Sequence, residues 1–247
     1  MNAWLLGSGS WLPTGRRETT SVLVRREGDA LVLDAGTGLR RLVTDSARLD
    51  GVAHIDVVLT HFHLDHVCGL AYLPALSQSP RIWAPGRWLY GRPSAELLAP
   101  LREPPISPFD AAELGEIVEL SAGPQRIEAF EVRAREQRRH WAPTAGLRVG
   151  DELALVTDTA FDPGSVPLAR GIANLLHEAW SSSTAPRSAE GDATGAEAGR
   201  VAAGAEAHRL TLVHLNPLLE DHEPVLADAR SEAPQAELGE DGQRLLP

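Results

Sequence analysis

Three histidines and one aspartate lie within six positions of the sequence, at His61, His63, Asp65 and His66. They come directly after an apolar run that predicts a buried strand over residues 54–59. Neutral imidazole and carboxylate are good ligands for zinc, manganese and iron. Two of the histidines project to one side of an extended backbone, and the other two residues turn toward a neighbouring point. The spacing therefore predicts two metal ions side by side, against the competing interpretation of a solvated histidine-rich loop.

Two more candidate ligands stand at the ends of apolar runs in the second half of the chain. Asp158 follows a strand predicted over residues 152–157, and His214 follows one predicted over 209–213. Ligands at strand ends are held rigidly and converge on one edge of a sheet. Taken alone, Asp158 fits an Asx turn and His214 fits a hydrogen-bonded core histidine. Their order after the histidine-rich segment favours metal ligation.

The composition is that of a globular protein, with 247 residues of which 43% are hydrophobic and 23% charged. No apolar stretch approaches the roughly 20 residues of a membrane span, and the first residues lack a secretory signal. There are 34 acidic and 23 basic residues, all of the latter arginine, so the net charge is -11. Such a chain disfavours non-specific binding of nucleic acid. The single cysteine, Cys68, predicts a reducing, cytoplasmic location.

Strands with interspersed helices are predicted in both halves of the chain. We therefore expect two sheets packed face to face with helices outside, formed by one domain of residues 1–247. Residues 127–132 predict one strand, and residues 194–207 predict a helix. The proline-rich residues 86–108 and the Ser/Ala/Gly-rich residues 181–195 predict surface loops.

Residues 61–66 match the H-x-H-x-D-H signature of the metallo-β-lactamase-fold hydrolases, and the resemblance extends over most of the chain. The glycine loop at 7–10 and the D-x-G-T-G turn at 34–38 look like the ribonuclease Z and phosphodiesterase branch of that family. Further similar segments are the H-x-x-P-x-x-G-x-R stretch at 140–148, the aspartate turn at 157–159, the L-L-H-E-A strand at 175–179 and the histidine turn at 212–217.

The resemblance implies an α/β fold, the four-layer αββα sandwich, with two divalent metal ions, zinc first and manganese or iron as alternatives. The implied ligands are His61, His63 and His140 for the first ion, Asp65, His66 and His214 for the second, and Asp158 as the bridge between them. A hydroxide between the ions is the implied nucleophile, and Asp65 would also orient it.

Two departures from the branch carry information. Ribonuclease Z inserts a long tRNA-gripping arm between the third-ligand histidine and the bridging aspartate, whereas only 17 residues, 141–157, separate His140 from Asp158 here. Together with the net charge, this disfavours tRNA processing. The second departure is Asp192, which stands where the branch commonly has a histidine near the leaving group. Asp192 either replaces that proton donor, paired with Glu178, or caps the following helix.

Two arginines alternate along the backbone that leads to His140. Because alternate residues of a strand share a face, Arg133 and Arg135 could recruit an anionic substrate. The alternative is a solvated face paired with local acids such as Glu131 and Glu136.

Four aromatic residues also follow or accompany the motifs. Trp11, Trp141 and Trp180 either wall the site or simply pack. His177, next to Glu178, is expected to be structural.

We therefore expect a binuclear metal-dependent hydrolase that acts on small or cyclic phosphodiesters. The expected partner is a small anionic substrate, with no membrane and no nucleic acid, and a homodimer is left open. Alternatives within the enzymes are a tRNA 3′-end endoribonuclease and a hydrolase of C–O or C–N bonds, as in lactonases and β-lactamases of the same fold. A non-catalytic protein on a decayed hydrolase fold is disfavoured by the complete ligand set.

Overall fold

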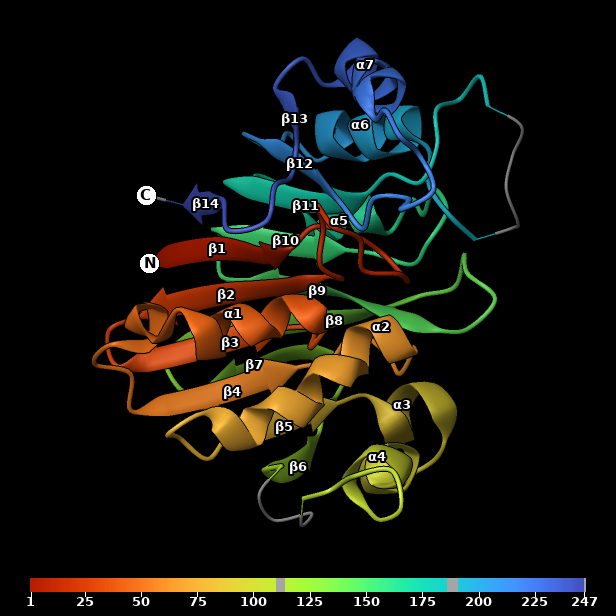
Figure 1. Cartoon of the computed structure of the whole chain (residues 1–247). Coiled ribbons are helices and arrows are strands. Elements are labelled where there is room, and N and C mark those ends of the chain that lie inside the picture. Colours follow the sequence, from red (N-terminus) through yellow and green to blue (C-terminus); the bar gives the residue numbers. More distant parts are fainter. Residues whose placement is uncertain (110–113, 186–190, 247) are drawn as a thin grey trace.

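The computed structural model describes residues 1–109, 114–185 and 191–246, and these form two seven-stranded sheets (Figure 1). The first sheet has the order β14-β1-β2-β3-β4-β5-β6. Neighbouring strands from β3 to β6 pair parallel, and the pairs β14-β1, β1-β2 and β2-β3 are antiparallel. Its strands are β1 (Asn2–Gly7), β2 (Ser21–Arg26), β3 (Asp29–Leu33), β4 (His54–Val58), β5 (Arg81–Ala84), β6 (Glu116–Glu119) and β14 (Arg244–Leu246).

The second sheet has the order β13-β12-β11-β10-β9-β8-β7, with β10 to β13 parallel. Its strands are β7 (Gly123–Ile127), β8 (Phe130–Gln137), β9 (Thr144–Val149), β10 (Leu153–Val156), β11 (Asn174–Glu178), β12 (Leu210–Val213) and β13 (Ala236–Leu238). Every residue of β10, β11 and β12 is buried. Strands covered on both faces read as continuous apolar runs, which is why the sequence predicted them.

Helices cover the outer face of each sheet. The α-helices are α1 (Arg40–Thr44), α2 (Leu64–Val67), α3 (Gly86–Tyr90), α4 (Ser94–Arg102), α5 (Ser165–Leu168), α6 (Gly195–Gly204) and α7 (Glu223–Glu232), and the 3-10 helices are Thr37–Leu39, Ser46–Leu49 and Cys68–Ala75. Helices α6 and α7 pack on the second sheet, and α1 and the Cys68–Ala75 helix pack on the first. The expected four-layer αββα sandwich is therefore confirmed. Among the described residues, no helix is both long enough and apolar enough to cross a membrane.

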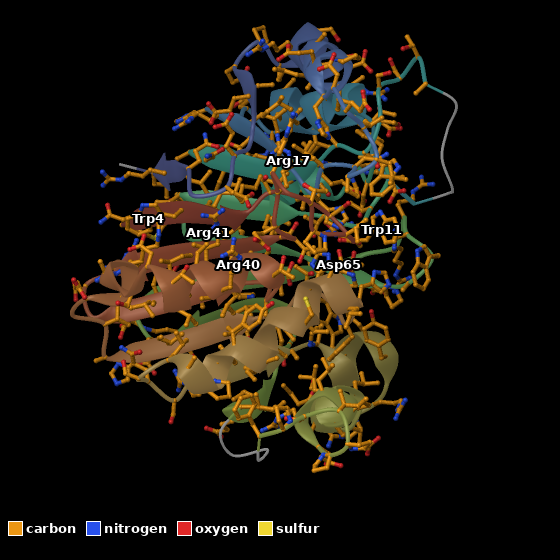
Figure 2. All side chains as sticks on the ribbon, viewed as in Figure 1. Trp4, Trp11, Arg17, Arg40, Arg41 and Asp65 are labelled. Carbon is orange, nitrogen blue, oxygen red and sulfur yellow. The ribbon has the colours of Figure 1, made fainter. Side chains whose placement is uncertain are left out.

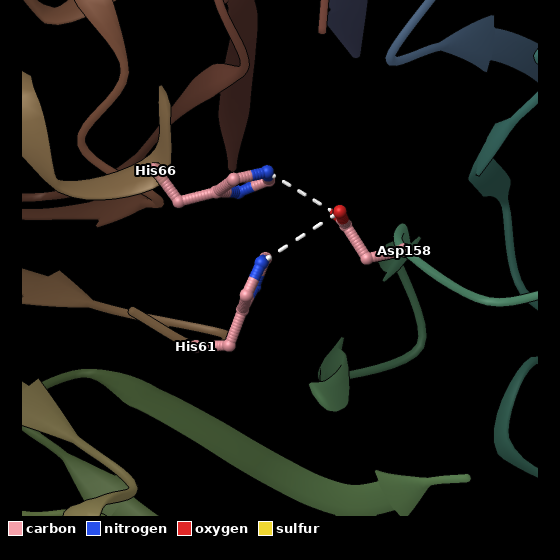
Figure 3. Close-up of side chains that lie close together, drawn as sticks. All are labelled: His61, His66 and Asp158. Atoms are coloured by element: carbon pink, nitrogen blue, oxygen red, sulfur yellow. Dashed lines mark ion pairs between the residues drawn. The ribbon is translucent and has the colours of Figure 1, made fainter. Parts of the chain in front are cut away.

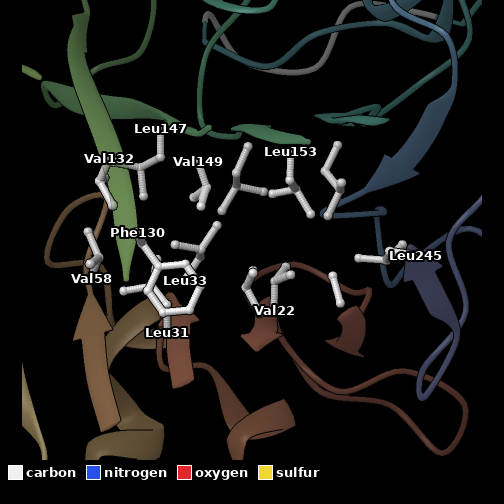
Figure 4. Packing of buried hydrophobic residues seen from close by; sticks show 14 of the residues in the cluster. Val22, Leu31, Leu33, Val58, Phe130, Val132, Leu147, Val149, Leu153 and Leu245 are labelled. Carbon is white, nitrogen blue, oxygen red and sulfur yellow. The ribbon is translucent and has the colours of Figure 1, made fainter. Parts of the chain in front are cut away.

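The main core lies between the two sheets (Figure 4). Phe130 of β8 packs there with Leu31 and Leu33 of β3, and Leu153 of β10 closes the same cluster. Each fully buried side chain of this kind contributes about 1.5–3 kcal/mol relative to an exposed one. This core aligns the two sheets, so that the loops at one end of both sheets meet.

The structure differs from the sequence prediction in two places outside the site. Residues 127–132 are not one strand, because Glu128 adopts a left-handed backbone (φ 46°) and turns the chain from β7 into β8, with Ile127 paired to Phe130. Residues 86–108 are not mostly loop, since α3 and α4 occupy much of them. The prediction for residues 181–195 falls partly on 186–190, which lie outside the described residues.

Candidate metal centre

The histidine-rich segment leaves β4 and enters α2 at the carboxyl end of the first sheet. His61 and His66 are completely buried, His63 is partly buried and Asp65 is 8% exposed. The hydroxyl of Thr60 lies 2.9 Å from His61 Nδ1, so that Nε2 of His61 points to the other side. A solvated histidine-rich loop is therefore the wrong interpretation.

The carboxylate of Asp158 faces four histidines, two of which, His61 and His66, are drawn in Figure 3. Its Oδ1 is 3.7 Å from His61 Nε2 and 3.7 Å from His63 Nδ1. Its Oδ2 is 3.2 Å from His66 Nε2 and 3.5 Å from His214 Nε2. One carboxylate thus presents each oxygen to a different pair of imidazoles, and Figure 3 shows one member of each pair, His61 and His66, converging on it.

The second set also contains Asp65. Its Oδ2 lies 3.2 Å from His66 Nε2 and 3.4 Å from His214 Nε2. The two imidazole nitrogens are themselves 3.3 Å apart. His140 joins the first set from the loop between β8 and β9, and its donor atom lies within 4.8 Å of those of His63 and Asp158. The structure therefore brings together all seven residues that the sequence singled out as ligands.

The strand order explains this convergence. Asp158 follows β10 and His214 follows β12, which run parallel in the second sheet, while the histidine-rich segment follows β4 in the first. Both Asp158 (φ 54°) and His214 (φ 50°) adopt the left-handed backbone region. That region is strained for residues other than glycine and concentrates at functional sites.

Sequence reasoning missed one residue that organises the site, Asp34. It directly follows β3 and is completely buried. His66 Nδ1 donates to Asp34 Oδ2 at 2.8 Å, and the amide and hydroxyl of Thr60 donate to the same carboxylate. The available signal was a charged residue directly after the apolar run of β3, in the turn already noted at residues 34–38.

The ionisable side chains of the site shift one another's pKa values. Burial, reinforced by the neighbouring His66 and His63, lowers the pKa of His61 well below its usual value and favours the neutral imidazole that a metal ligand must be. For His214, burial is outweighed by the carboxylates of Asp158 and Asp65, which raise its pKa to about 10. The pKa of Asp158 lies well below its usual range, because four histidines, His214, His66, His61 and His63, outweigh the effect of its burial. Without metal, protons on imidazole balance the carboxylates.

Orphaned polar atoms test whether a metal fits here. Within the described part of the chain, His61 Nε2, His140 Nε2 and Asp158 Oδ2 are buried and have no hydrogen-bond partner. Buried polar atoms without partners are costly and call for an explanation. Imidazole and carboxylate converging in this way are the donors that zinc, manganese and iron accept. The residues present therefore fit divalent metal ions.

Glu178 lies beside Nδ1 of His214, and Asp192 lies near Nδ1 of His140. Glu178 is completely buried, accepts a hydrogen bond from the Thr159 amide, and has Oε2 3.5 Å from His214 Nδ1. Burial raises the pKa of Glu178 to about 8, and Asp192 adds to the rise. Asp192 Oδ1 is 4.0 Å from His140 Nδ1, and burial raises the pKa of Asp192 as well.

The helix-cap interpretation of Asp192 is wrong. Thr194 is the N-cap of α6, with its side chain accepting from the Glu197 amide. The Glu197 side chain in turn accepts from the Thr194 amide, which completes a capping box. Thr194 is the cap because it directly precedes the first residue of α6, whereas Asp192 lies two residues further upstream.

The two arginines singled out for substrate binding lie away from the ligands. Val132 and Ala134 of β8 point into the core, so Arg133 and Arg135 project from the outer face of the second sheet. Arg135 forms a two-pronged ion pair with Asp162, at 2.7 and 3.1 Å. Arg133 lines surface grooves in which none of the seven candidate ligands takes part.

Comparison with known proteins identifies the family of this fold. The profile of the Metallo-beta-lactamase superfamily matches residues 14–151. The curated ribonuclease Z of Nocardia farcinica is 28% identical over 275 aligned positions, which cover 88% of this chain and 89% of that protein.

Two solved structures share the fold over nearly their whole length. The metallo-beta-lactamase fold protein YhfI from Bacillus subtilis has a TM-score of 0.80 at 17% identity, covering 98% of this chain and 97% of that one. A diphosphatase from the PhnP family has a TM-score of 0.74 at 18% identity, covering 100% and 97%. Because the family profile spans more than half of the chain, the protein belongs to the metallo-beta-lactamase superfamily and is a metal-dependent hydrolase.

Proposed function

We propose that this protein hydrolyses small phosphodiesters at a two-metal centre, with zinc as the first candidate. The proposed ligands are His61, His63 and His140 for one ion, Asp65, His66 and His214 for the other, and Asp158 for both. The observation that carries the proposal is the placement of Asp158, whose two oxygens face different pairs of histidines. This division of the two carboxylate oxygens suits a residue that binds one ion through each oxygen.

Divalent ions held by these residues would lower the pKa of a bound water to near neutral and draw charge from the phosphoryl oxygen. Asp65 contributes a carboxylate that stays ionised, because His66 and His214 keep its pKa well below its usual range despite its burial. It accepts a hydrogen bond from the attacking water and orients it. Asp192, whose pKa is raised by burial, donates a proton to the departing oxygen.

The chain between His140 and Asp158 supports a small substrate. It consists of β9, a turn and β10, and the strands pair as a tight hairpin, with Leu153 opposite Val149. Within residues 141–157, all of which the structure describes, there is no inserted arm that could hold a folded RNA. The fold neighbour described as a diphosphatase is compatible with a small phosphate-containing substrate. Arg133 and Arg135 are not part of the proposal, because they project from another face.

A second candidate is tRNA 3′-end cleavage, which is favoured by the similarity to a ribonuclease Z over 88% of this chain. The net charge of -11 disfavours it, since binding of a long polyanion relies on neutralising phosphates. We further propose that residues 1–247 act as one domain, because ligands come from both sheets. The single Cys68 supports a reducing, cytoplasmic setting.

The decisive experiment is hydrolysis by metal-analysed protein of bis-p-nitrophenyl phosphate, a cyclic nucleotide, a lactone, a β-lactam and a precursor tRNA. We expect turnover of the diesters and little or no accurate cleavage of the tRNA. A matched protein with Asp158→Ala controls for contaminating hydrolases. Efficient tRNA cleavage with inactive small diesters would establish the second candidate instead.

A further inference from the structure

Exposed apolar side chains gather around the metal centre. In the described part of the chain, seven large apolar side chains are exposed, and five of them lie in segments that carry candidate ligands or are hydrogen-bonded to such segments. These five, here called the apolar rim, are Trp11, Leu12, Leu64, Trp141 and Leu218. Scattered single apolar residues on a surface need no explanation, whereas several exposed in the segments of one site do.

The chain itself ties the rim to the candidate ligands. Leu64 lies between His63 and Asp65, and Trp141 directly follows His140. The other side of the rim is joined through the backbone. The amide of Ser10, next to Trp11, donates to the carbonyl of Leu215 at 3.2 Å, and Leu215 directly follows His214. Figure 2 shows Trp11 and Asp65 on the same side of the molecule.

Trp141 is the most exposed member of the rim, and yet it is held in place. Its indole stacks on the imidazole of His63, with ring centroids 4.4 Å apart and planes 19° apart. It also lies 5.2 Å from the ring of His140. Nevertheless 75% of Trp141 remains open to solvent. The indole is thus fixed to one candidate ligand while most of its surface is free.

The loop that carries Trp141 is anchored at both ends. The hydroxyl of Tyr90 donates to the carbonyl of Pro143 at 2.7 Å. The amide of Ala160 donates to the carbonyl of Arg139 at 3.0 Å, which ties the loop to the turn that follows Asp158. Trp141 is therefore presented at the mouth of the site by a braced loop.

This arrangement combines two recognition chemistries at adjacent points. The centre is polar and suits the anionic phosphoryl group, and the rim beside it is apolar and aromatic. Ligand sites commonly pair a few placed polar groups with apolar walls, and an indole favours contact with another flat ring. Because Trp141 contacts the rings of two proposed ligands, His63 and His140, a group held at the proposed ions would lie near its indole.

We propose that Trp141, supported by Leu64, is a specificity residue that binds an aromatic ring carried by the substrate next to its phosphoryl group. The substrate class is then aryl or nucleoside-type phosphate esters rather than simple alkyl esters. The inference rests on the proposed function only for placing a phosphoryl group at the ions. The rim supplies affinity for the ring and takes no part in bond cleavage.

The test measures binding without hydrolysis. Calorimetry on the metal-loaded protein gives dissociation constants for methylphosphonate, phenylphosphonate and benzylphosphonate, which share the anion and differ in the ring. We expect at least one aromatic phosphonate to bind about threefold to tenfold more tightly than methylphosphonate, the range of a single aromatic contact. Trp141→Ala should abolish that preference, and Trp141→Phe should retain most of it.

Ile106→Ala is the matched control, because Ile106 is an exposed apolar residue outside the rim. It should leave the preference unchanged, and metal content should be equal in all variants. The proposal is overturned if neither aromatic phosphonate binds more tightly than methylphosphonate, or if Trp141→Ala keeps the preference. It is also overturned if Trp141→Ala instead weakens self-association of the protein in sedimentation, since the rim would then bind a second copy. A ring preference without any diester hydrolysis would refute the proposed function and leave this inference standing.

Discussion

The imidazole of His66 donates from Nδ1 to Asp34 Oδ2 at 2.8 Å, and both side chains are completely inaccessible to solvent. This bond links the turn after β3 to the helix after β4. It leaves Nε2 of His66 directed at Asp65 and Asp158. A carboxylate that orients a ligating histidine sets both its tautomer and its basicity.

Asp34→Ala should therefore weaken metal binding and activity by about 10- to 100-fold. The measurement is metal affinity by competition with a chelator. Asp56→Asn is the matched control, because Asp56 is also a buried aspartate of the first sheet but pairs with Arg81 and Trp83. Equal loss of metal affinity in both variants would show that general destabilisation is responsible.

Loss of a ligand should separate activity from folding. We expect Asp65→Ala and His63→Ala to lower diester hydrolysis by about 100-fold or more while the circular dichroism spectrum is unchanged. His63 and Asp65 lie beyond the end of β4, at the start of the short helix α2, so the core between the sheets is untouched. Elemental analysis should give about two ions per chain in the wild type and fewer in Asp158→Ala. Near wild-type turnover in His63→Ala with excess metal contradicts the proposed site.

Asp192→His should alter leaving-group dependence. If Asp192 protonates the departing oxygen, an imidazole there should raise the rate most for esters with poor leaving groups. Bis-p-nitrophenyl phosphate, with its good leaving group, should be nearly unaffected. The readout is the slope of rate against leaving-group pKa. A uniform fall in rate for all esters would mean that Asp192 acts by orienting His140.

Arg135→Ala should act on stability rather than on catalysis. Its ion pair with Asp162 has two prongs and is about a third exposed, so we expect a loss of about 1 kcal/mol in the free energy of unfolding. Arg133→Ala, on the same face, should change stability by less. Urea denaturation measures the effect of each substitution on stability, and KM measures its effect on substrate binding. A raised KM with unchanged stability would restore Arg135 to the substrate site.

His177 should make the metal-free protein less stable in acid. Burial lowers its pKa to about 4 in the folded state, against about 6.5 when unfolded. Above pH 6.5 both states are neutral at this residue and the stability is fully present. As the pH falls from 6.5 to 4, the unfolded chain takes up a proton that the folded protein does not. The wild type should lose about 3 kcal/mol more than His177→Gln over this range.

Urea denaturation curves measured at pH 7 and at pH 4 in the presence of a chelator give the free energies of unfolding that test this difference. Both proteins are compared in the chelator, so that release of metal cannot account for the result. Parallel loss of stability in the wild type and in His177→Gln would show that other groups dominate the acid sensitivity.

The prediction of a surface loop over residues 86–108 was wrong, because the helices α3 and α4 form there. Proline and glycine in residues 86–108 predicted loop, yet Pro93 precedes α4 as its N-cap and Pro100 lies inside it. Ser94 links this segment to Ala84 and Glu119, and Leu98 is buried in the core outside the first sheet. Packing on a sheet thus overrode weak local propensity, because burial of apolar surface outweighs the cost of an unfavourable residue.

The sequence by itself determined a fold of two packed sheets and, through the family resemblance that its motifs carry, the seven candidate ligands. Apolar strands ending in histidine or aspartate are local features, and parallel strands necessarily bring such ends to one edge. The tertiary structure alone decided which groups face each other. In the folded protein, the two oxygens of Asp158 face different histidines, and Asp34 accepts a hydrogen bond from His66. Thr194 is the N-cap of α6. It also left Trp141 exposed on His63. These relationships join residues far apart in the chain, so they depend on how the sheets pack rather than on local spacing.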